Sequence, residues 1–551
     1  MPLAPALSLP RKLFYAALAS GAALMLLLGG LELGLRAAGS GHSPHLFRKE
    51  KTAAGEIVWR ENRWVTAPYF PPALVRRPQP LRLPEKKASG TYRIFILGSS
   101  AAMGDPEPAF SLARVLEVML RDAYPRQRFE VVNAAITAIN SHVVRDLAAD
   151  CAELEPDLFI VYEGNNEVIG PFGPAGVLAP FLRREGAIRT VAWLKGTRTG
   201  QLLASLGRKD ARADWGGMEM FLQQQIAADD PRLATVRANF AANLQAISAS
   251  GRRAGATTLL CTVATNQRDF APFLSANGEA ERVYQQARAA LAAGRDDEAR
   301  PLFQRALDLD TLRFRADSAL NDVIRNLDGT AGVQLVDAAA ALAAQSPHGV
   351  CGDEFFYEHV HLNLRGTYAL ARTLLPAITA DLARHGTTAS SQPPLEPSAL
   401  AVRLGYTTYE QSMIALEMVR RLGRPPFTGQ SDHAARLARW QRAADQGMAL
   451  LARPDATAAL REIGRQAVAQ APDDWMLARN TGAMLVSRQQ AAEALPLLER
   501  AAAWIDDDPD TLVALGWAHR TLGHSAEADA AFARTRVLEP DYPNLPPAGA
   551  K

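Results

Sequence analysis

The sequence predicts an α/β protein with a parallel sheet, followed by an all-α region and preceded by one hydrophobic helix. Five short apolar runs without polar alternation alternate with helical segments, which is typical of a parallel sheet covered on both faces. These runs are Tyr92–Leu97, Phe129–Asn133, Leu158–Glu163, Thr258–Val263 and Val333–Val336. The helical segments include Phe110–Leu120 and Leu233–Ser250. We therefore expect a three-layer α/β/α domain over residues 91–384.

The overall composition is that of a globular protein of two or three domains. The chain has 551 residues, and 60 basic against 58 acidic residues give a net charge of +2. This balance gives no sign of nucleic-acid binding. The three cysteines, Cys151, Cys261 and Cys351, are too few for a disulfide framework and match no metal-ligand spacing. We expect buried thiols, with one disulfide and a leftover thiol as the alternative, and no metal or cofactor.

The N-terminus carries a hydrophobic segment of membrane-spanning length. Arg11 and Lys12 precede Leu13–Leu31, a run of 19 residues without a charge, against the ~20 needed to cross a hydrocarbon core. Basic residues before the segment favour a cytoplasmic N-terminus. We expect a cytoplasmic tail at 1–12 and a signal anchor at 13–35 in a bacterial inner membrane. The remainder would then lie outside the cytoplasm; a cleaved signal peptide is the alternative.

Two segments do not fit the strand–helix alternation. Residues 36–90 are rich in Pro, Arg and aromatic residues without clear periodicity, and we interpret them as a packed stalk. Residues 170–230 are rich in Gly, Arg and Gln and contain Trp193 and Trp215. We interpret this second segment as a long insertion over the face that carries the motifs.

Helical repeats are predicted in two places. Apolar and small residues in 279–310 have the spacing of a helical hairpin. After a linker at 385–400, residues 401–551 are wholly helical in pattern. Leu512, Gly516, Ala528 and Phe532 lie within residues 509–542 at positions that resemble the tetratricopeptide repeat (TPR), with a 34-residue period. The resemblance implies stacked helix pairs with a concave surface for a protein partner.

Four motifs occur in order between residues 94 and 366. They are Ile94–Gly104, which ends in Gly-x-Ser-x-x-x-Gly; Val131–Ala138; Tyr162–Glu167; and Glu358–Asn363, with Gly366 behind it. Together they supply a hydroxyl, donors for an oxyanion, and a carboxylate–imidazole pair, which are the parts of nucleophilic ester chemistry. The set resembles the SGNH (GDSL-type) hydrolase family over residues 91–384. In the α/β-hydrolase alternative the acid lies far from the His, whereas here both share one loop.

The resemblance assigns a nucleophile and three oxyanion donors. Ser100 matches the family's nucleophile, while Ser99 stands where the family has Asp. The donors would be the backbone N–H of Ser100, the backbone N–H of Ala138 at a position where Gly is usual, and the side chain of Asn166. Glu167 follows Asn166 where Asp is usual.

The last motif supplies a general base and its acid. By the family's spacing His361 is the base, and Glu358, three residues earlier, takes the place of the usual Asp. Phe356 stands three residues before His359, so we expect His359 to have no acid of its own. Asp353 is a reserve carboxylate. In a separate loop, Arg268 would either contact an anionic group of the substrate or form a salt bridge.

Three functions remain open. The first is a membrane-anchored extracytoplasmic esterase that acts on an acylated glycan or lipid of the envelope, with a protein partner at the TPR region. The second is a polysaccharide O-acyltransferase with the same triad. The third is a scaffold with a vestigial site, for which Ser99, Ala138, Glu167 and Glu358 are the departures. All four are conservative in mechanism, whereas a vestigial site more often loses the Ser or the His outright, and this favours catalysis.

Overall fold

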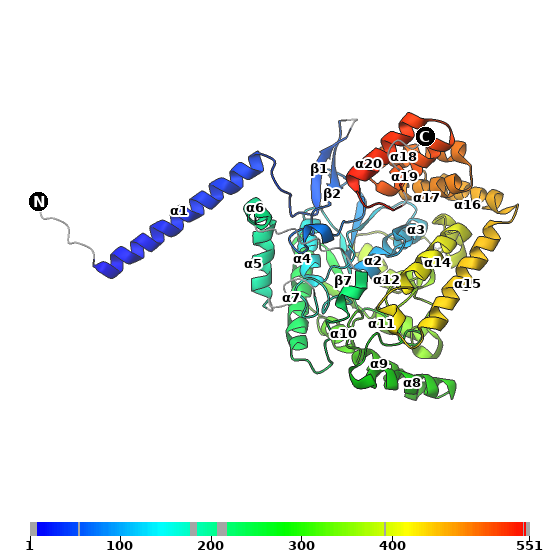
Figure 1. Ribbon diagram of the computed structural model, residues 1–551, viewed down its shortest axis with the longest axis horizontal. Helices are drawn as coiled ribbons and strands as arrows, with labels where there is room; N and C mark the ends of the chain where they lie inside the picture. Colours follow the sequence, from blue (N-terminus) through cyan, green and yellow to red (C-terminus); the bar gives the residue numbers. More distant parts are fainter. Residues whose placement is uncertain are drawn as a thin grey trace, which may run out of the picture.

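A computed structural model describes residues 8–52, 55–176, 184–206, 217–390, 393–543 and 545–546 of the chain. Figure 1 shows one long helix, α1, projecting from a body in which helices surround a parallel sheet. The C-terminal helices curve along one side of this body and end near strands β1 and β2.

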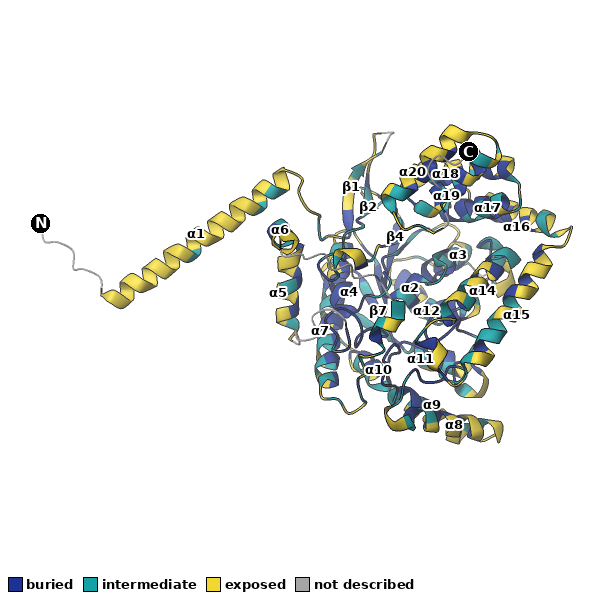
Figure 2. Cartoon of the chain, viewed as in Figure 1, coloured by how far each residue is buried: buried dark blue, intermediate teal, exposed yellow. Residues whose placement is uncertain are grey.

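Helix α1 (Leu9–Ala37) has no buried residue. Its most apolar 18-residue window has a mean hydropathy of 1.8, and no other helix in the described residues is long and apolar enough to cross a membrane. Figure 2 shows the helix exposed along almost its whole length. Because large apolar surfaces are unfavourable in water, this exposed helix is a candidate membrane span by its length and composition.

A small antiparallel sheet follows α1. Its strands β1 (Phe47–Lys51), β2 (Ile57–Glu61) and β3 (Arg82–Pro84) pair in the order β1-β2-β3. The sequence did not predict these strands, because charged residues occupy much of β1 and β2. The predicted stalk thus contains a sheet that packs against the body.

The predicted parallel sheet is confirmed. Its five strands have the order β5-β4-β6-β7-β8, and every neighbouring pair is parallel. The strands are β4 (Thr91–Gly98), β5 (Arg128–Asn133), β6 (Leu158–Tyr162), β7 (Thr257–Cys261) and β8 (Val333–Val336). The order reverses between β4 and β6, and open parallel sheets bind ligands where the strand order reverses, beyond the carboxyl ends of the strands.

Two pairs of helices cover the sheet. Helix α3 (Leu112–Ala123) contacts β5 and α12 (Leu364–Arg384), while α4 (Ser141–Ala152) contacts β4 and α7 (Arg232–Arg253). Strand β4 is buried at every residue, as a central strand covered on both faces must be.

The insertion at 170–230 contains three short elements, α5 (Glu185–Gly196), α6 (Arg198–Leu206) and η3 (Gly217–Phe221). Residues 177–183 and 207–216, including Trp215, lie outside the described part. In residues 279–310 two helices, α8 (Glu279–Ala292) and α9 (Asp296–Asp308), pack together.

After residue 396, the described residues form helices and loops but no strand. The helices are α13 (Pro397–Arg403), α14 (Thr408–Leu422), α15 (His433–Leu451), α16 (Ala456–Gln470), α17 (Trp475–Ser487), α18 (Ala491–Trp504), α19 (Pro509–Thr521) and α20 (Ser525–Leu538), with the short η6 (Phe427–Gly429). The remaining helices of the body are η1 (Pro72–Leu74), α2 (Ser100–Met103), η2 (Pro108–Phe110), η4 (Ala276–Gly278), α10 (Ser318–Arg325), α11 (Ala338–Gln345) and η5 (Pro347–Gly349).

Ion pairs and hydrogen bonds join the helical region to the rest of the chain at several points. Arg114 on α3 pairs with Asp474, which accepts a hydrogen bond at the start of α17. Arg60 on β2 pairs with Asp507, and the Arg63 guanidinium donates to the carbonyl oxygen of Leu538, 2.8 Å away. The helical region is therefore fixed against both the small sheet and the α/β domain.

Close approach of helices α19 and α20 generates a stability prediction. A Cβ added at Gly516 would lie 2.6 Å from the ring of Phe532, and that ring is 1% exposed and cannot move aside. Gly516→Leu should destabilise the protein by ~1–3 kcal/mol through overpacking, measured as a shift of the thermal unfolding midpoint. Gly429→Leu is the control, because nothing lies within 4 Å of its Cβ position; equal shifts for the two variants would contradict the packing described here.

Candidate active site

Ser100 lies at the carboxyl end of β4, beside the point where the strand order reverses. It begins the short helix α2, so its backbone N–H is one of those that a helix leaves without an intrahelical partner. Gly98, two residues earlier, has φ 155°, and a Cβ there would lie 2.2 Å from the carbonyl oxygen of Tyr162 on β6. Only glycine lets the ends of β4 and β6 approach this closely.

His361 meets Ser100 from a loop 261 residues further along the chain. Its Nε2 lies 2.8 Å from the Ser100 Oγ, and its Nδ1 contacts a carboxylate oxygen of Glu358. A bridge between Phe356 and Leu362 closes the loop that carries both residues. A hydroxyl bonded to an imidazole that is itself held by a buried carboxylate has the geometry needed for removal of the hydroxyl proton.

Glu358 is completely buried and still charged. Burial opposes ionisation, but the neighbouring His359 and His361 hold its pKa well below the ordinary value. The backbone N–H of Val360 also donates to its Oε2, at 3.0 Å. The carboxylate thus has a partner on each oxygen.

The structure corrects the expectation that His359 has no acid. Its Nδ1 contacts the second oxygen of Glu358, so one carboxylate serves two imidazoles. Rings of Phe270, Phe273 and Phe427 surround His359 with centroids 5.1–5.9 Å away. Burial among these rings lowers the pKa of His359, so a neutral imidazole contacts the second oxygen of Glu358. Glu358, His359 and His361 also place ligand atoms within 4.8 Å of one another, as a metal site would.

Two further charged residues reach the site, and the sequence analysis missed both. Asp105, seven residues after Gly98, has a carboxylate oxygen 3.5 Å from the His361 Nε2. Arg421, on α14 of the helical region, pairs with Asp105 and lies 3.8 Å from Glu358. Asp105 directly follows the first motif, but no local pattern marks Arg421.

The charges of this cluster set the pKa of His361. Burial disfavours the charged imidazole, yet Glu358 and Asp105 outweigh burial and raise its pKa above the ordinary value. Burial likewise opposes charge on Asp105, but His361 and Arg421 lower its pKa. The site is therefore a compact network of two acids, an imidazole and a guanidinium.

The predicted oxyanion donors face one cavity. Ser100, Ala138 and Asn166 all line the same cavity. Ala138 has φ 59°, a left-handed backbone conformation that is strained for any residue but glycine. The amide of Asn166 donates to the carbonyl oxygen of Ile139, 2.9 Å away, and this uses one of its two N–H donors.

Glu167 braces the neighbouring loop. Its carboxyl accepts hydrogen bonds from the backbone N–H and the hydroxyl of Ser141, at 2.9 and 2.7 Å. Burial raises the pKa of Glu167 to about 7 despite these bonds. Glu163, at the end of β6 and also buried, has a pKa raised well above its ordinary value, first by burial and then by Glu167. Glu163 and Glu167 are thus buried acidic residues next to the Asn166 loop.

The cavity over Ser100 has a volume of about 700 Å³. Its walls come from the motif loops, from η3 of the insertion and from the end of α14. Apart from the residues already named, its lining includes Arg76, Met218, Phe221, Phe314, Arg424 and Phe427.

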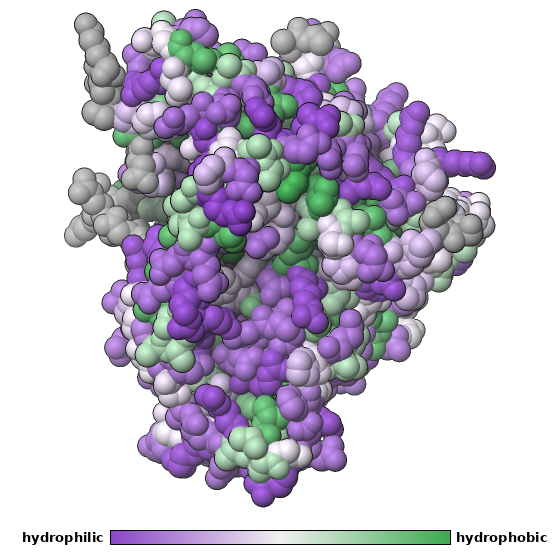
Figure 3. All heavy atoms as spheres, turned by 90° about the vertical axis from the view of Figure 1, so that its right-hand side faces the viewer, coloured by the Kyte–Doolittle hydropathy of each residue, from purple (hydrophilic) through white to green (hydrophobic). Residues whose placement is uncertain are grey.

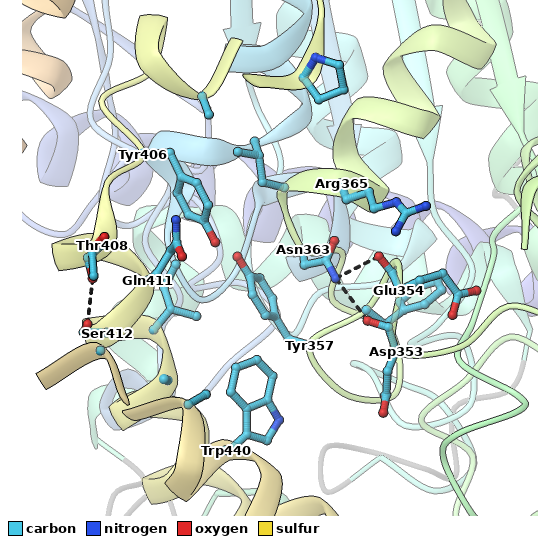
Figure 4. Close-up of a pocket in the computed structure, with 18 of the residues that line it drawn as sticks. Asp353, Glu354, Tyr357, Asn363, Arg365, Tyr406, Thr408, Gln411, Ser412 and Trp440 are labelled. Atoms are coloured by element: carbon cyan, nitrogen blue, oxygen red, sulfur yellow. Dashed lines mark hydrogen bonds between the residues drawn. The ribbon is translucent and has the colours of Figure 1, made fainter. Parts of the chain in front are cut away.

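A second cavity of about 870 Å³ lies between the α/β domain and the helical region, behind the His361 loop. Figure 4 shows the hydroxyl of Tyr357, from that loop, directed toward the hydroxyl of Tyr406, while Trp440 of the helical region lies below Tyr357 in this view. Ser100 and His361 do not line this cavity, so it is separate from the candidate active site.

The other residues that the sequence analysis named, Arg268, Asp353 and the three cysteines, lie outside the cluster. Arg268 pairs with Asp269 and Glu354, so it forms the salt bridge that was one of its two interpretations. The reserve acid Asp353 pairs with Arg439 and accepts from Asn266. The three cysteines are free and buried, as expected.

No family model and no curated protein matches the sequence. Solved structures similar to part of the chain include an acetyl xylan esterase, at 14% identity and a TM-score of 0.27, over 52% of this chain and 99% of that one. A lipase/acylhydrolase from Enterococcus faecalis has 13% identity and a TM-score of 0.28, over 52% of this chain and 95% of the other. An acetylxylan esterase catalytic mutant from Geobacillus stearothermophilus has 15% identity and a TM-score of 0.26, over 53% and 96%.

The Asp105–Arg421 pair generates a prediction about stability. Arg421→Met should destabilise the protein by ~1–3 kcal/mol, because the buried carboxylate of Glu358 and the partly buried carboxylate of Asp105 lose their cation. The Arg421 side chain is 20% exposed, which limits the loss. Adding Asp105→Asn to the Arg421→Met variant should restore part of the lost stability, as measured by a double-mutant cycle on unfolding midpoints.

Arg420→Met is the matched control for this cycle. Its side chain is 58% exposed and pairs with Glu417 on the same helix, so its loss should cost under ~0.5 kcal/mol. Equal losses of stability in Arg420→Met and Arg421→Met would show that the Asp105–Arg421 pair does not join the helical region to the α/β domain.

Proposed function

We propose that this chain is a membrane-anchored serine esterase with Ser100 as nucleophile, His361 as general base and Glu358 as the acid that orients the base. The observation that carries the proposal is the 2.8 Å contact between the His361 Nε2 and the Ser100 Oγ at the wall of a cavity. A vestigial site has no reason to keep this contact together with a buried, ionised Glu358.

The chemistry follows from the positions of the groups. His361 removes the proton of Ser100 as its oxygen attacks the ester carbonyl, and the negative oxygen that forms is held by the N–H groups of Ser100 and Ala138 and the amide of Asn166. His361 then gives its proton to the departing alcohol, which leaves an acyl-Ser100. Water, deprotonated by the same imidazole, then attacks the acyl carbonyl; the bond to the Ser100 oxygen breaks, His361 returns the proton to that oxygen, and the acid is released. Glu358 keeps the proton-bearing Nδ1 in place throughout.

The anchor and the substrate class are part of the same proposal. Helix α1 is exposed and contains the uncharged run Leu13–Leu31, which Arg11 and Lys12 precede; this supports a membrane span with the active site outside the cytoplasm. Substrates available there are acylated glycans or lipids of the envelope. The paired helices after residue 396 and the close contacts at Gly516 support a TPR-like region for a protein partner.

Acyl transfer to a sugar uses the same acyl-Ser100 and remains the alternative product. The two outcomes differ only in what attacks the acyl group, water or a sugar hydroxyl. Incubating the protein with an acyl donor and a polysaccharide separates them: release of free acid alone identifies a hydrolase, whereas acylated polysaccharide identifies a transferase.

The triad predicts a specific ranking of variants. Ser100→Ala and His361→Ala should each lower kcat/KM for p-nitrophenyl acetate at least about a thousandfold, because triad members act as a unit. Glu358→Gln should cost less, since the oxyanion donors remain. A serine-directed phosphonate should label Ser100, mapped by mass spectrometry. An active His361→Ala variant, or a label on another serine, would refute the assignment.

The charge network predicts the pH dependence. The reaction needs neutral His361, so activity should rise with pH through the raised pKa of this residue and fall below it. The carboxylate of Asp105 raises the pKa of His361, whereas the guanidinium of Arg421 lowers it. Asp105→Asn removes the first effect and leaves the second unopposed by Asp105, so the acid limb of kcat/KM should move to lower pH. Asp353→Asn is the control. Asp353 precedes the loop that carries His361, but it pairs with Arg439 and not with His361, so the acid limb should stay in place. An unmoved limb in Asp105→Asn would contradict the network.

A further inference from the structure

The hairpin of α5 and α6 exposes large apolar side chains. Trp193 and Leu194 in the last turns of α5 are 68% and 49% exposed, and Leu203 and Leu206 in α6 are 61% and 75% exposed. Leu203 and Leu206 are three residues apart, so they share one face of their helix. Ile188 and Ala192 of α5 are buried instead, so α5 presents one face to the body and leaves the other uncovered.

This hairpin is tied to the end of α1. The Glu32 carboxylate accepts hydrogen bonds from the backbone N–H groups of Arg198 and Thr199, at 3.1 and 2.8 Å, and from the Thr199 hydroxyl, at 3.0 Å. Glu32 directly follows the uncharged run Leu13–Leu31. The start of α6 is therefore held at the level where α1 would leave a bilayer.

The exposed side chains lie close to that level. Leu206 is seven residues beyond Thr199, a helical rise of about 10 Å, and Trp193 is six residues before it. Residues 184–206 contain four basic residues and one acidic residue. Basic helices that expose Trp and Leu beside a span have the composition of helices that lie in the headgroup region of an anionic membrane.

We propose that α5 and α6 rest on the lipid bilayer that α1 spans, with Trp193, Leu194, Leu203 and Leu206 inserted at the interface. The proposal rests on the anchoring proposed above and adds a second contact to it. Continuity with α1 selects the bilayer as occupant, because a protein partner on this face would have to share it with lipid. The face on the right-hand side of Figure 1, away from α1, is mainly hydrophilic, with apolar residues in small scattered groups (Figure 3).

The test uses full-length protein in lipid nanodiscs whose acyl chains carry bromine near the headgroup, which quenches nearby tryptophan fluorescence. Helix α1 contains no tryptophan, so quenching reports the rest of the chain and not the anchor. Trp193→Phe should lower the quenched fraction of the emission at least twofold. Trp517→Phe is the matched control: Trp517 is 38% exposed on α19, in the helical region, and its removal should leave the quenched fraction unchanged.

A second variant tests the apolar contact directly. Leu203→Glu/Leu206→Glu should also lower the quenched fraction, because it places charge at the interface while Trp193 remains. A quenched fraction that neither Trp193→Phe nor the double variant changes would overturn the interfacial hairpin, and Ser100 labelling in the same discs would still report on the esterase. Failure of the protein to enter nanodiscs or to float with vesicles would instead refute the anchor and the hairpin contact together.

Discussion

The charge of Glu358 is the constraint on which the rest of the site depends. A carboxylate without solvent contact costs several kcal/mol unless its oxygens are paired. Here the partners are His359, His361 and the N–H of Val360, with Arg421 3.8 Å away. Only His361 can act on Ser100; the others keep the acid ionised so that it can hold the His361 ring. The aromatic surroundings of His359 and the placement of α14 both serve this requirement.

The helical region is therefore part of the candidate active site and not an appended module. Arg421 reaches Asp105, beside Ser100, from a helix that begins 308 residues after Ser100, and Phe427 packs against the ring of His359. A protein partner that moved α14 would change the charge near His361 and so its pKa. Regulation through such a partner would thus appear in the pH profile as well as in the rate.

The sequence predicted the elements whose signals are local. The five strands of the parallel sheet are short apolar runs, and Val333–Val336 matches its predicted bounds. Ser100, Glu358 and His361 belong to motifs with fixed spacing, and the structure brings them together. The motif spacing assigns one histidine to each acid, so it could not predict that Glu358 contacts His359 as well as His361. Asp105 and Arg421 are 316 residues apart, so no local sequence pattern could predict that they pair. The strands β1–β3 are short and carry charged residues, so they show no apolar pattern that would predict a strand.

The two membrane contacts would also fix where the active site lies. The insertion that carries α5 and α6 continues to η3, whose Met218 and Phe221 line the cavity over Ser100. Gly217 lies eleven positions after Leu206, a chain span of at most ~40 Å, so a hairpin resting on the bilayer would keep the cavity wall near it. With both proposed contacts made, an ester held in or near that bilayer would reach Ser100 by moving in two dimensions. The curved helical region lies across the body from α1 and the hairpin (Figure 1), which leaves it free for a partner away from the membrane surface.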